Sequence, residues 1–365
     1  MKSIFSILPR YMNRNFLVNF TFLILLLLFI VMIFDLVELM RRTSEYNVEI
    51  STILKMTLLK LPEVGQLILP FAVLFSGIFT FWRLNRTSEL YVMRAAGLSA
   101  LQFTLPLIFA AFCIGLIATT VINPISSVLL AKFEKMEDRY IKKTGNLISV
   151  TKNGVWLRQN NPDGGYSLLN AAKLNTQRWT LKDIILIEFD DDNNFIRRIE
   201  AQNGKLETSA WVLERGDIYT QTPIATPFEV MNIKTDLTPQ DILDTFSTVE
   251  NVSFWKIPEF IKTLKETGFS TERLEVHYQS LIARPFFFAA MILLAATVSL
   301  RPSRQGGTTK MVILGVAIGF LLFFTDSMLK AFGISEKIPI FLSAWTPTIV
   351  SILLGGSVLL QQEEG

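Results

Sequence analysis

Long apolar runs alternate with polar intervals along the chain, and this pattern predicts its architecture. A helix of about 20 mostly apolar residues can cross a lipid bilayer, and the chain has six such runs, three before and three after one long polar interval. The first run is too long and too rich in phenylalanine for a cleaved signal peptide, so we expect it to remain as an anchor. The predicted transmembrane helices cover about residues 16–34, 67–82, 101–122, 285–300, 311–329 and 338–360.

The long polar interval begins as a helix and then changes to strands. Between Ser126 and Tyr140 apolar residues recur every three or four positions, so the third run is expected to continue as an amphipathic helix. Short apolar runs separated by turn residues follow, which is typical of a β-sandwich or a rolled antiparallel sheet. The predicted strands are at 154–158, 166–169, 184–189, 195–199 and 205–208, with turns at 161–165, 191–194, 203–204 and 214–217.

Helices are expected again at the end of the interval. Thr238-Pro-Gln-Asp241 has the spacing of a capping box with proline at the first helical position, and Gly268 is placed to end a helix over residues 257–266. A last helix from about Thr271 leads into the fourth run, where Pro285 should kink it. The expected fold is therefore membrane α-helical, with transmembrane helices 1–3 in residues 1–124, an inserted all-β, jellyroll-like domain with flanking helices in residues 125–277, and transmembrane helices 4–6 in residues 278–365.

Composition agrees with an integral membrane protein. Half of the residues are hydrophobic, 18% are charged, and the mean hydropathy is +0.39. The net charge of +3 is too small to indicate nucleic-acid binding. Cys113 and His277 are the single cysteine and histidine, which argues against a disulfide framework, a Cys/His metal site and a Ser-His-Asp triad. We expect no catalytic residue and no metal site in this chain.

The basic residues of the short loops predict an orientation in the membrane. Cytoplasmic loops retain lysine and arginine, and three segments on one side are basic: the N-terminus, the loop after the second run and the loop before the fifth. Both termini are then cytoplasmic, and the strand-rich domain lies outside. The residues concerned are Lys2, Arg10, Arg14, Arg83, Arg86, Arg94, Arg301, Arg304 and Lys310.

A short polar and basic helix between the second and third runs is the most informative segment. It covers about residues 84–97 and would be presented to the cytoplasm. The chain has no Gly-x-x-x-x-Gly-Lys-Ser/Thr loop, since Gly306-Gly-Thr-Thr-Lys310 has the wrong spacing and is better explained as a flexible loop. A membrane protein that offers such a helix and lacks a nucleotide site is expected to be moved by an ATPase on another chain.

Several motifs make the chain similar to a known family. They are Thr87-Ser-Glu-Leu-Tyr-Val-Met-Arg-Ala-Ala-Gly-Leu-Ser99, Pro62-Glu63, Leu69-Pro70 and Arg284-Pro285. Together they resemble the LptF/LptG permeases of the lipopolysaccharide export machine, and the resemblance extends over nearly the whole chain. Residues 35–42 and 154–157 are more similar to the LptG branch than to the LptF branch.

The resemblance implies partners, cargo and location. A member of this family is expected in the bacterial inner membrane, in a heterodimer with an LptF-like permease. Two copies of an LptB-like ATPase would drive it with ATP and magnesium, and lipopolysaccharide would pass through a periplasmic β-jellyroll to an LptC-like, membrane-anchored bridge protein. The chain itself is then a non-catalytic transport subunit without a cofactor. Its apolar strands suit both a filled core and an open interior that holds acyl chains.

The resemblance also implies which residues of the 84–97 helix contact the ATPase. Glu89 would pair with a basic residue in a groove of the ATPase, while Leu90, Tyr91 and Met93 would fill that groove, and Arg94 is assigned to the same coupling surface. The simpler alternative is an exposed helix that lies on the membrane.

The charges at the end of the first run allow two interpretations. Glu38 and Arg42 share a helix face with Asp35 and can pair, and Arg41 and Arg42 can be interfacial anchors that end the helix. Alternatively, the two arginines bind the phosphates of a lipid headgroup, because guanidinium holds phosphate through two parallel hydrogen bonds. The resemblance favours the second interpretation.

Asp326 is the notable acid of the fifth run. A carboxylate within a membrane helix is costly and usually faces a cavity or a partner, and pairing with Lys330 near the interface is the simpler interpretation. If the first and fifth helices line a common cavity, as the resemblance implies, Asp326 and Glu38 are candidate charges of that cavity. Gly315 and Gly319 form a pattern of small residues that favours close helix packing.

Other functions fit parts of the same pattern. The chain can be the LptF paralogue of the same complex, or a mechanotransmitting ABC subunit that moves an external domain without transporting lipid. It can also be a scaffold or sensor whose external domain recruits envelope proteins. The 84–97 helix argues against a scaffold, and a basic pair that faces a lipid cavity would argue against pure mechanotransmission.

Overall fold

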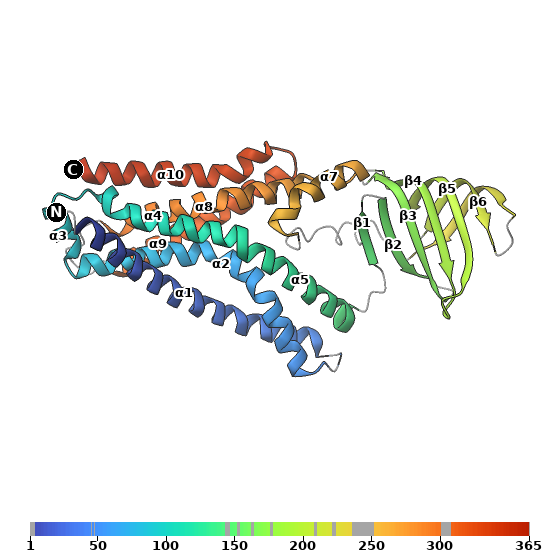
Figure 1. Cartoon of the computed structure of the whole chain (residues 1–365), viewed down its shortest axis with the longest axis horizontal. Coiled ribbons are helices and arrows are strands. Elements are labelled where there is room, and N and C mark those ends of the chain that lie inside the picture. The colour runs from blue at the N-terminus through green and yellow to red at the C-terminus, as the bar shows by residue number, and fades with distance from the viewer. Residues whose placement is uncertain are drawn as a thin grey trace. The chain divides into compact units, whose positions relative to one another are not determined.

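The chain divides into two compact units. The computed structural model describes residues 4–44, 46, 48–142, 147–151, 154–161, 164–175, 178–207, 210–220, 224–235, 252–300 and 308–364. The membrane unit consists of residues 1–136, 253–255 and 275–365, and the β unit consists of residues 137–252 and 256–274. Figure 1 labels their helices and strands.

The membrane unit contains the predicted transmembrane helices. Within the described residues, six helices are long and apolar enough to cross a membrane, which confirms the expected number. α1 lies beside α2 along much of its length (Figure 1). The helices are α1 (Ile4–Thr43), α2 (Ile50–Arg86), α4 (Ala100–Ile117), which continues through a π-helical turn (Ala118–Ile122) into α5 (Asn123–Glu137), α8 (Glu272–Ser299), α9 (Thr308–Ile334) and α10 (Ile340–Glu364).

α8 continues through Pro285, and a neighbouring helix supplies the hydrogen bond that proline removes. Proline has no backbone N–H, so the carbonyl of Leu281, four residues earlier, loses its donor within the helix. The Thr119 hydroxyl, in the π-helical turn after α4, donates to that carbonyl oxygen at 3.0 Å. A Cβ atom on Gly115 would lie 2.6 Å from the Cα atom of Pro285, so only glycine fits where the two helices cross. Thr119 and Gly115 thus allow proline inside a membrane helix.

Glycines also bring α9 close to α2. A Cβ atom on Gly315 would lie 2.5 Å from Cδ1 of Ile78, and one on Gly319 would lie 3.3 Å from the ring of Phe71. Gly315 and Gly319 are one helical turn apart, so they present the same face of α9 to α2. The close packing predicted from these two glycines is therefore confirmed.

The β unit is a rolled antiparallel sheet, as predicted. Its described strands follow one another in chain order, each hydrogen-bonded to the next (Figure 1). A jellyroll has Greek-key crossovers, so this sheet is like a jellyroll in its curvature and not in its strand order. The strands are β1 (Leu147–Thr151), β2 (Gly154–Asn160), β3 (Tyr166–Asn175), β4 (Thr180–Phe189), β5 (Phe195–Glu207), β6 (Ala210–Tyr219) and β7 (Thr226–Lys234).

Two of the predicted turns are wrong. Asn203-Gly204 lies inside β5, so the two short strands predicted beside it are one strand. A Cβ atom on Gly204 would lie 2.5 Å from Cδ1 of Ile184 and 2.9 Å from Cδ2 of Leu213, so this glycine makes room for packed side chains. Residues 214–217 lie inside β6, where Arg215 has a φ of 53° and forms no pair in the ladders to β5 and β7. In both segments the glycine lies within a strand that continues on either side of it, where it allows close approach or a local irregularity of the ladder.

One buried face of the sheet forms the core of the β unit. Leu169 on β3, Leu186 on β4 and Trp211 on β6 are fully buried. The buried Gln159 side chain accepts hydrogen bonds from Trp211 Nε1 at 3.3 Å and from the Thr235 hydroxyl at 2.7 Å. These side chains are inaccessible to solvent in this conformation.

α7 (Ile257–Thr267) confirms the helix predicted over residues 257–266. Gly268 ends it with a φ of 86°, in the left-handed region that glycine adopts without steric cost. The capping box of residues 238–241 lies outside the described residues, as do Lys2, Arg301, Arg304 and residues 306–307.

Candidate functional site

α3 (Glu89–Ala95) is a short helix with a backbone break on each side. Directly before α3, Ser88 adopts left-handed backbone with a φ of 60°. After α3, Gly97 has a φ of 84°, and the Ser99 hydroxyl accepts a hydrogen bond from the N–H of Gln102 at 3.1 Å to begin α4. The two breaks make α3 a separate element between α2 and α4.

The polar contacts of α3 tie it to α1 and to the end of α2. The Glu89 carboxylate accepts hydrogen bonds from the Thr87 hydroxyl at 2.8 Å and from the Tyr11 hydroxyl at 3.3 Å. The start of α1, α3 and the end of α10 lie at the same end of the membrane unit (Figure 1). The segments that carry the first two basic clusters of the sequence therefore meet at that end.

The apolar side chains of α3 divide between the core and the surface. Leu90 is 4% and Met93 7% exposed, and both belong to the hydrophobic core of the membrane unit. Tyr91 is 56% and Val92 68% exposed, and Arg94 is exposed beside them. The predicted contact of Leu90 and Met93 with a groove of the ATPase stays a prediction, and in this conformation both side chains are held in the core of their own chain. Tyr91, Val92 and Arg94 are the large exposed side chains of α3.

At the far end of α1, two ion pairs involve the predicted charged residues. Arg41 forms a two-point contact with Glu38, at 2.9 Å from Nε and 2.7 Å from Nη2, whereas the sequence spacing favoured Arg42 as the partner. Asp35 accepts a hydrogen bond from Lys60 of α2 at 2.7 Å, and this pair is more buried. Arg41 is largely exposed, with 74% of its side-chain surface accessible. Arg41 is thus the more accessible end of a charged cluster that joins α1 to α2.

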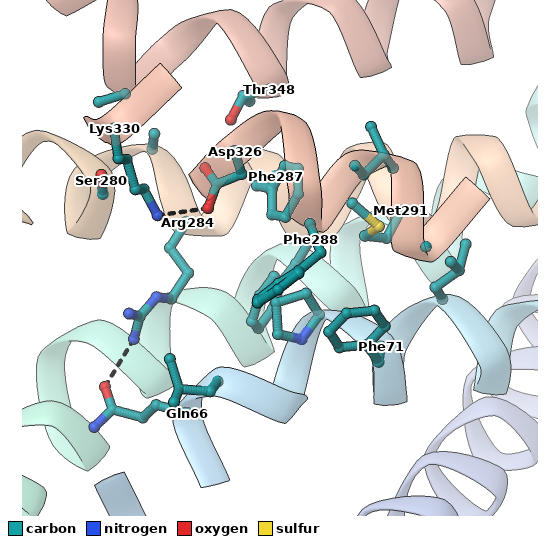
Figure 2. Close-up of a pocket in the computed structure, with 18 residues that line it drawn as sticks. Gln66, Phe71, Ser280, Arg284, Phe287, Phe288, Met291, Asp326, Lys330 and Thr348 are labelled. Carbon is teal, nitrogen blue, oxygen red and sulfur yellow. Dashed lines mark hydrogen bonds and ion pairs between the residues drawn. The ribbon is translucent and has the colours of Figure 1, made fainter. Parts of the chain in front are cut away.

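A cavity of about 120 Å³ lies among α2, α8, α9 and α10 (Figure 2). Most of its wall is apolar, with phenylalanine from three of the helices. Gln66 and Arg284 each come directly before an apolar run of the sequence, and Lys330 comes directly after one. Gln66, Arg284 and Lys330 therefore lie at one boundary of the apolar layer. The polar lining consists of Gln66, Ser280, Arg284, Asp326, Lys330 and Thr348.

Two of the three described charged side chains that line this cavity form an ion pair with each other, and the third, Arg284, bonds to a neutral amide. Lys330 and Asp326 form an ion pair of 2.6 Å, which confirms the predicted pairing of Asp326, and Asp326 also lines the cavity. The half-buried Arg284 donates from Nη1 to the amide oxygen of Gln66 at 2.8 Å. Figure 2 shows its guanidinium directed toward Gln66 and away from the Lys330–Asp326 pair. Among the described residues, no carboxylate forms an ion pair with Arg284.

Residues 10–361, nearly the whole chain, match the family model described as lipopolysaccharide export system permease LptF/LptG. The chain belongs to this family. A relative in Haemophilus influenzae, the lipopolysaccharide export system permease protein LptG, is 22% identical over 352 residues, which cover 95% of this chain and 96% of the relative. The protein of the same name from Escherichia coli K12 is 22% identical over 370 residues, which cover 98% and 99% of the two chains.

Membership of the LptF/LptG family confirms the resemblance found in the motifs. The chain is a lipopolysaccharide export permease of the inner membrane, with several transmembrane helices and a β-sheet domain. Both relatives are LptG proteins, in agreement with the greater similarity to that branch. The sequence did not lead us to expect Arg284 and Gln66 in a cavity. A signal was present, because each residue directly precedes an apolar run, which places both at the same depth in the membrane.

Proposed function

We propose that this LptF/LptG permease extracts lipopolysaccharide from the outer leaflet of the inner membrane and passes it to a periplasmic, LptC-like bridge protein. It forms a heterodimer with an LptF-like permease, and two copies of an LptB-like ATPase hydrolyse ATP with magnesium to drive it. The observation that carries the proposal is α3, a separate helix that exposes Tyr91, Val92 and Arg94 in a chain whose sequence has no ATP-binding loop.

α3 has the features of a coupling helix. Tyr91 and Val92 offer apolar surface, and Arg94 and Glu89 add charges of both signs. Leu90 and Met93 anchor the helix in the core, so a force applied to its exposed face moves the membrane helices with it. In this proposal the end of the membrane unit that carries α3 and both termini is cytoplasmic, since the basic loop residues lie there.

Arg41 and Arg42 are the proposed contacts for the lipid headgroup. The ion pair of Arg41 with Glu38 is exposed, and exposed pairs contribute little to stability. A phosphate can therefore replace the carboxylate of Glu38 at small cost, and a guanidinium binds phosphate in the same two-point geometry. Asp35 and Lys60 remain paired beneath and hold α1 against α2.

The β unit is the proposed route toward the bridge protein. β1 and β7 are the edge strands of its sheet, and edge strands offer unpaired backbone groups to a strand of another chain. Its inward side chains, such as Leu186 and Trp211, are fully buried. Passage of acyl chains through this roll therefore requires it to open during transport.

The test of the proposal begins at α3. Replacing both Tyr91 and Val92 by alanine removes exposed apolar surface and leaves the core intact. We expect the variant to insert and to pair with the partner permease, while recovery of the ATPase in affinity purification falls about tenfold. Val230→Ala is the matched control, because Val230 is 63% exposed in β7, away from α3 in the sequence. Normal recovery of the ATPase with the double variant would contradict the coupling role.

Transport is tested separately in proteoliposomes that contain the assembled complex and the bridge protein. ATP-dependent crosslinking of lipopolysaccharide to the bridge protein is the expected result. If the complex hydrolyses ATP and no lipopolysaccharide reaches the bridge protein, the chain is a mechanotransmitting subunit and the proposed transport is wrong.

A further inference from the structure

The cavity among α2, α8, α9 and α10 has an unbalanced charge. Arg284 and Lys330 are basic and Asp326 is acidic, so these three side chains sum to one positive charge. Lys330 and Asp326 neutralise each other at 2.6 Å. Asp326 also attracts Arg284 electrostatically, but the group that hydrogen-bonds to the guanidinium is the neutral amide of Gln66, which compensates only a small part of its charge. A cation within a membrane helix is costly unless a counter-charge is present, so the cavity is complementary to an anion.

The guanidinium retains capacity for such an anion. It has five N–H donors in a planar fork, and Gln66 accepts from one nitrogen, Nη1. No other acceptor among the described residues bonds to Arg284. Two parallel donors of this fork match two oxygens of a phosphate, which is the geometry in which arginine binds phosphate most strongly.

The rest of the cavity is suited to an acyl chain. Beyond the polar boundary, the wall consists of apolar side chains that include Phe71, Phe288 and Met291 (Figure 2). The volume of about 120 Å³ is smaller than the ~300–1,000 Å³ of sites that enclose a whole small molecule. A bound amphiphile would therefore place its phosphate and the beginning of one chain in the cavity. The remainder can leave between α2 and α9, where Leu67 and Phe323 line the cavity and are also exposed.

We infer that Arg284 binds the phosphate of a lipid headgroup, with the first part of an acyl chain held among α2, α8 and α9. Gln66 orients the guanidinium, and Lys330 holds the carboxylate of Asp326 in an ion pair. This inference deepens the proposed function, on which it rests for the identity of the natural lipid. It adds a phosphate site that is distinct from Arg41 and Arg42 on α1.

The experiment uses the full chain in phosphatidylcholine nanodiscs. Two photoactivatable probes carry the same diazirine acyl chain, one on phosphatidic acid and one on phosphatidylcholine, and mass spectrometry measures the labelling of α8 and α9. We expect phosphatidic acid to label these helices at least about tenfold more than phosphatidylcholine. Arg284→Gln should remove that preference, and Arg284→Lys should retain part of it, because lysine keeps the charge and loses the fork. Equal labelling by the two probes, or an unchanged preference in Arg284→Gln, would overturn the inference.

A second variant changes the labelling in the opposite direction. Asp326→Asn removes the negative charge near Arg284 and releases Lys330, so labelling by phosphatidic acid should rise, a result that misfolding cannot produce. A fall in labelling would contradict the assignment. Excess inorganic phosphate should compete poorly, because it has no acyl chain; full competition would identify a site for free phosphate and overturn the lipid assignment.

The control is Arg86→Gln, which changes an arginine at the α3 end of α2, and we expect it to leave labelling unchanged. The assay contains neither lipopolysaccharide nor the ATPase. Failure of export in the complex would therefore contradict the proposed function and not the phosphate site. Loss of the labelling preference with export intact would refute the phosphate site alone.

Discussion

The contact of Thr119 with α8 gives a sharp test of how this chain accommodates proline inside a membrane helix. Thr119→Val keeps the shape of the side chain and removes the hydroxyl that donates to the Leu281 carbonyl. Interhelical hydrogen bonds in membranes are worth about 0.6–1.7 kcal/mol, and a buried carbonyl left without a partner costs about 1–3 kcal/mol. We therefore expect the variant to lower the free energy of unfolding by about 1–2 kcal/mol.

The loss of unfolding free energy caused by Thr119→Val should depend on Pro285. In a Pro285→Ala chain the backbone N–H of residue 285 is restored and can donate to Leu281, four residues earlier. Thr119→Val in that background should cost about 0.5 kcal/mol or less, so the two changes should be coupled by about 1 kcal/mol. Thr120→Val is the matched control, because the Thr120 hydroxyl bonds to Leu116 within its own helix and not to α8.

Reversible unfolding of the full chain in mixed micelles, followed by tryptophan fluorescence, measures these differences. The reasoning would be refuted if Thr119→Val cost the same with proline and with alanine at position 285. In that case the hydroxyl would not be replacing the donor that proline lacks.

Two further predictions concern the lipid contacts and the β unit. Replacing Arg41 and Arg42 together by alanine should lower lipopolysaccharide crosslinking to the assembled complex by about tenfold or more, with basal ATP hydrolysis and assembly retained; unchanged crosslinking would leave them as membrane anchors. The pKa of Asp190 lies below its ordinary value, chiefly because it accepts hydrogen bonds from the backbone and side chain of Asn194. Its stabilising effect should be present above the pKa of the unfolded chain and lost as the pH falls through the lower pKa of the folded state. Thermal unfolding of Asp190→Ala and of the unchanged chain should accordingly differ at neutral pH and converge in acid.

The parts of the fold that depend on local pattern were predictable. Membrane helices follow from uninterrupted apolar runs, and α7 follows from its periodicity and the glycine at its end. The positions at which strands end were not predictable. Asn203-Gly204 is typical of a turn, but Gly204 lies inside a strand, where the side chains of Ile184 and Leu213 on neighbouring strands leave no room for a larger residue. A single sequence contains no record of which strands will be neighbours.

The candidate sites show the same limit. The four apolar residues of α3 are consecutive, so their pattern does not reveal which of them the chain itself buries. Only the packed core distinguishes Leu90 and Met93 from Tyr91 and Val92. Likewise, Asp326 could be paired with Lys330 from its spacing along one helix, whereas the contact of Arg284 with Gln66 joins residues far apart in the sequence.

One packed core links α3 to the phosphate-binding cavity that we infer. Leu90 and Met93 belong to the same cluster of buried side chains as Leu74, Phe288 and Met291, which line the cavity. Close-packed interiors transmit displacements, but contact alone does not establish coupling. Met93→Ala provides the test, because it opens a gap in this cluster and leaves the exposed face of α3 unchanged. In the assembled complex with the unchanged chain, we expect ATP hydrolysis to change lipid labelling of the cavity. Met93→Ala should abolish this change while the complex retains its ATPase; an ATP response equal to that of the unchanged chain would show that the movement travels by another route.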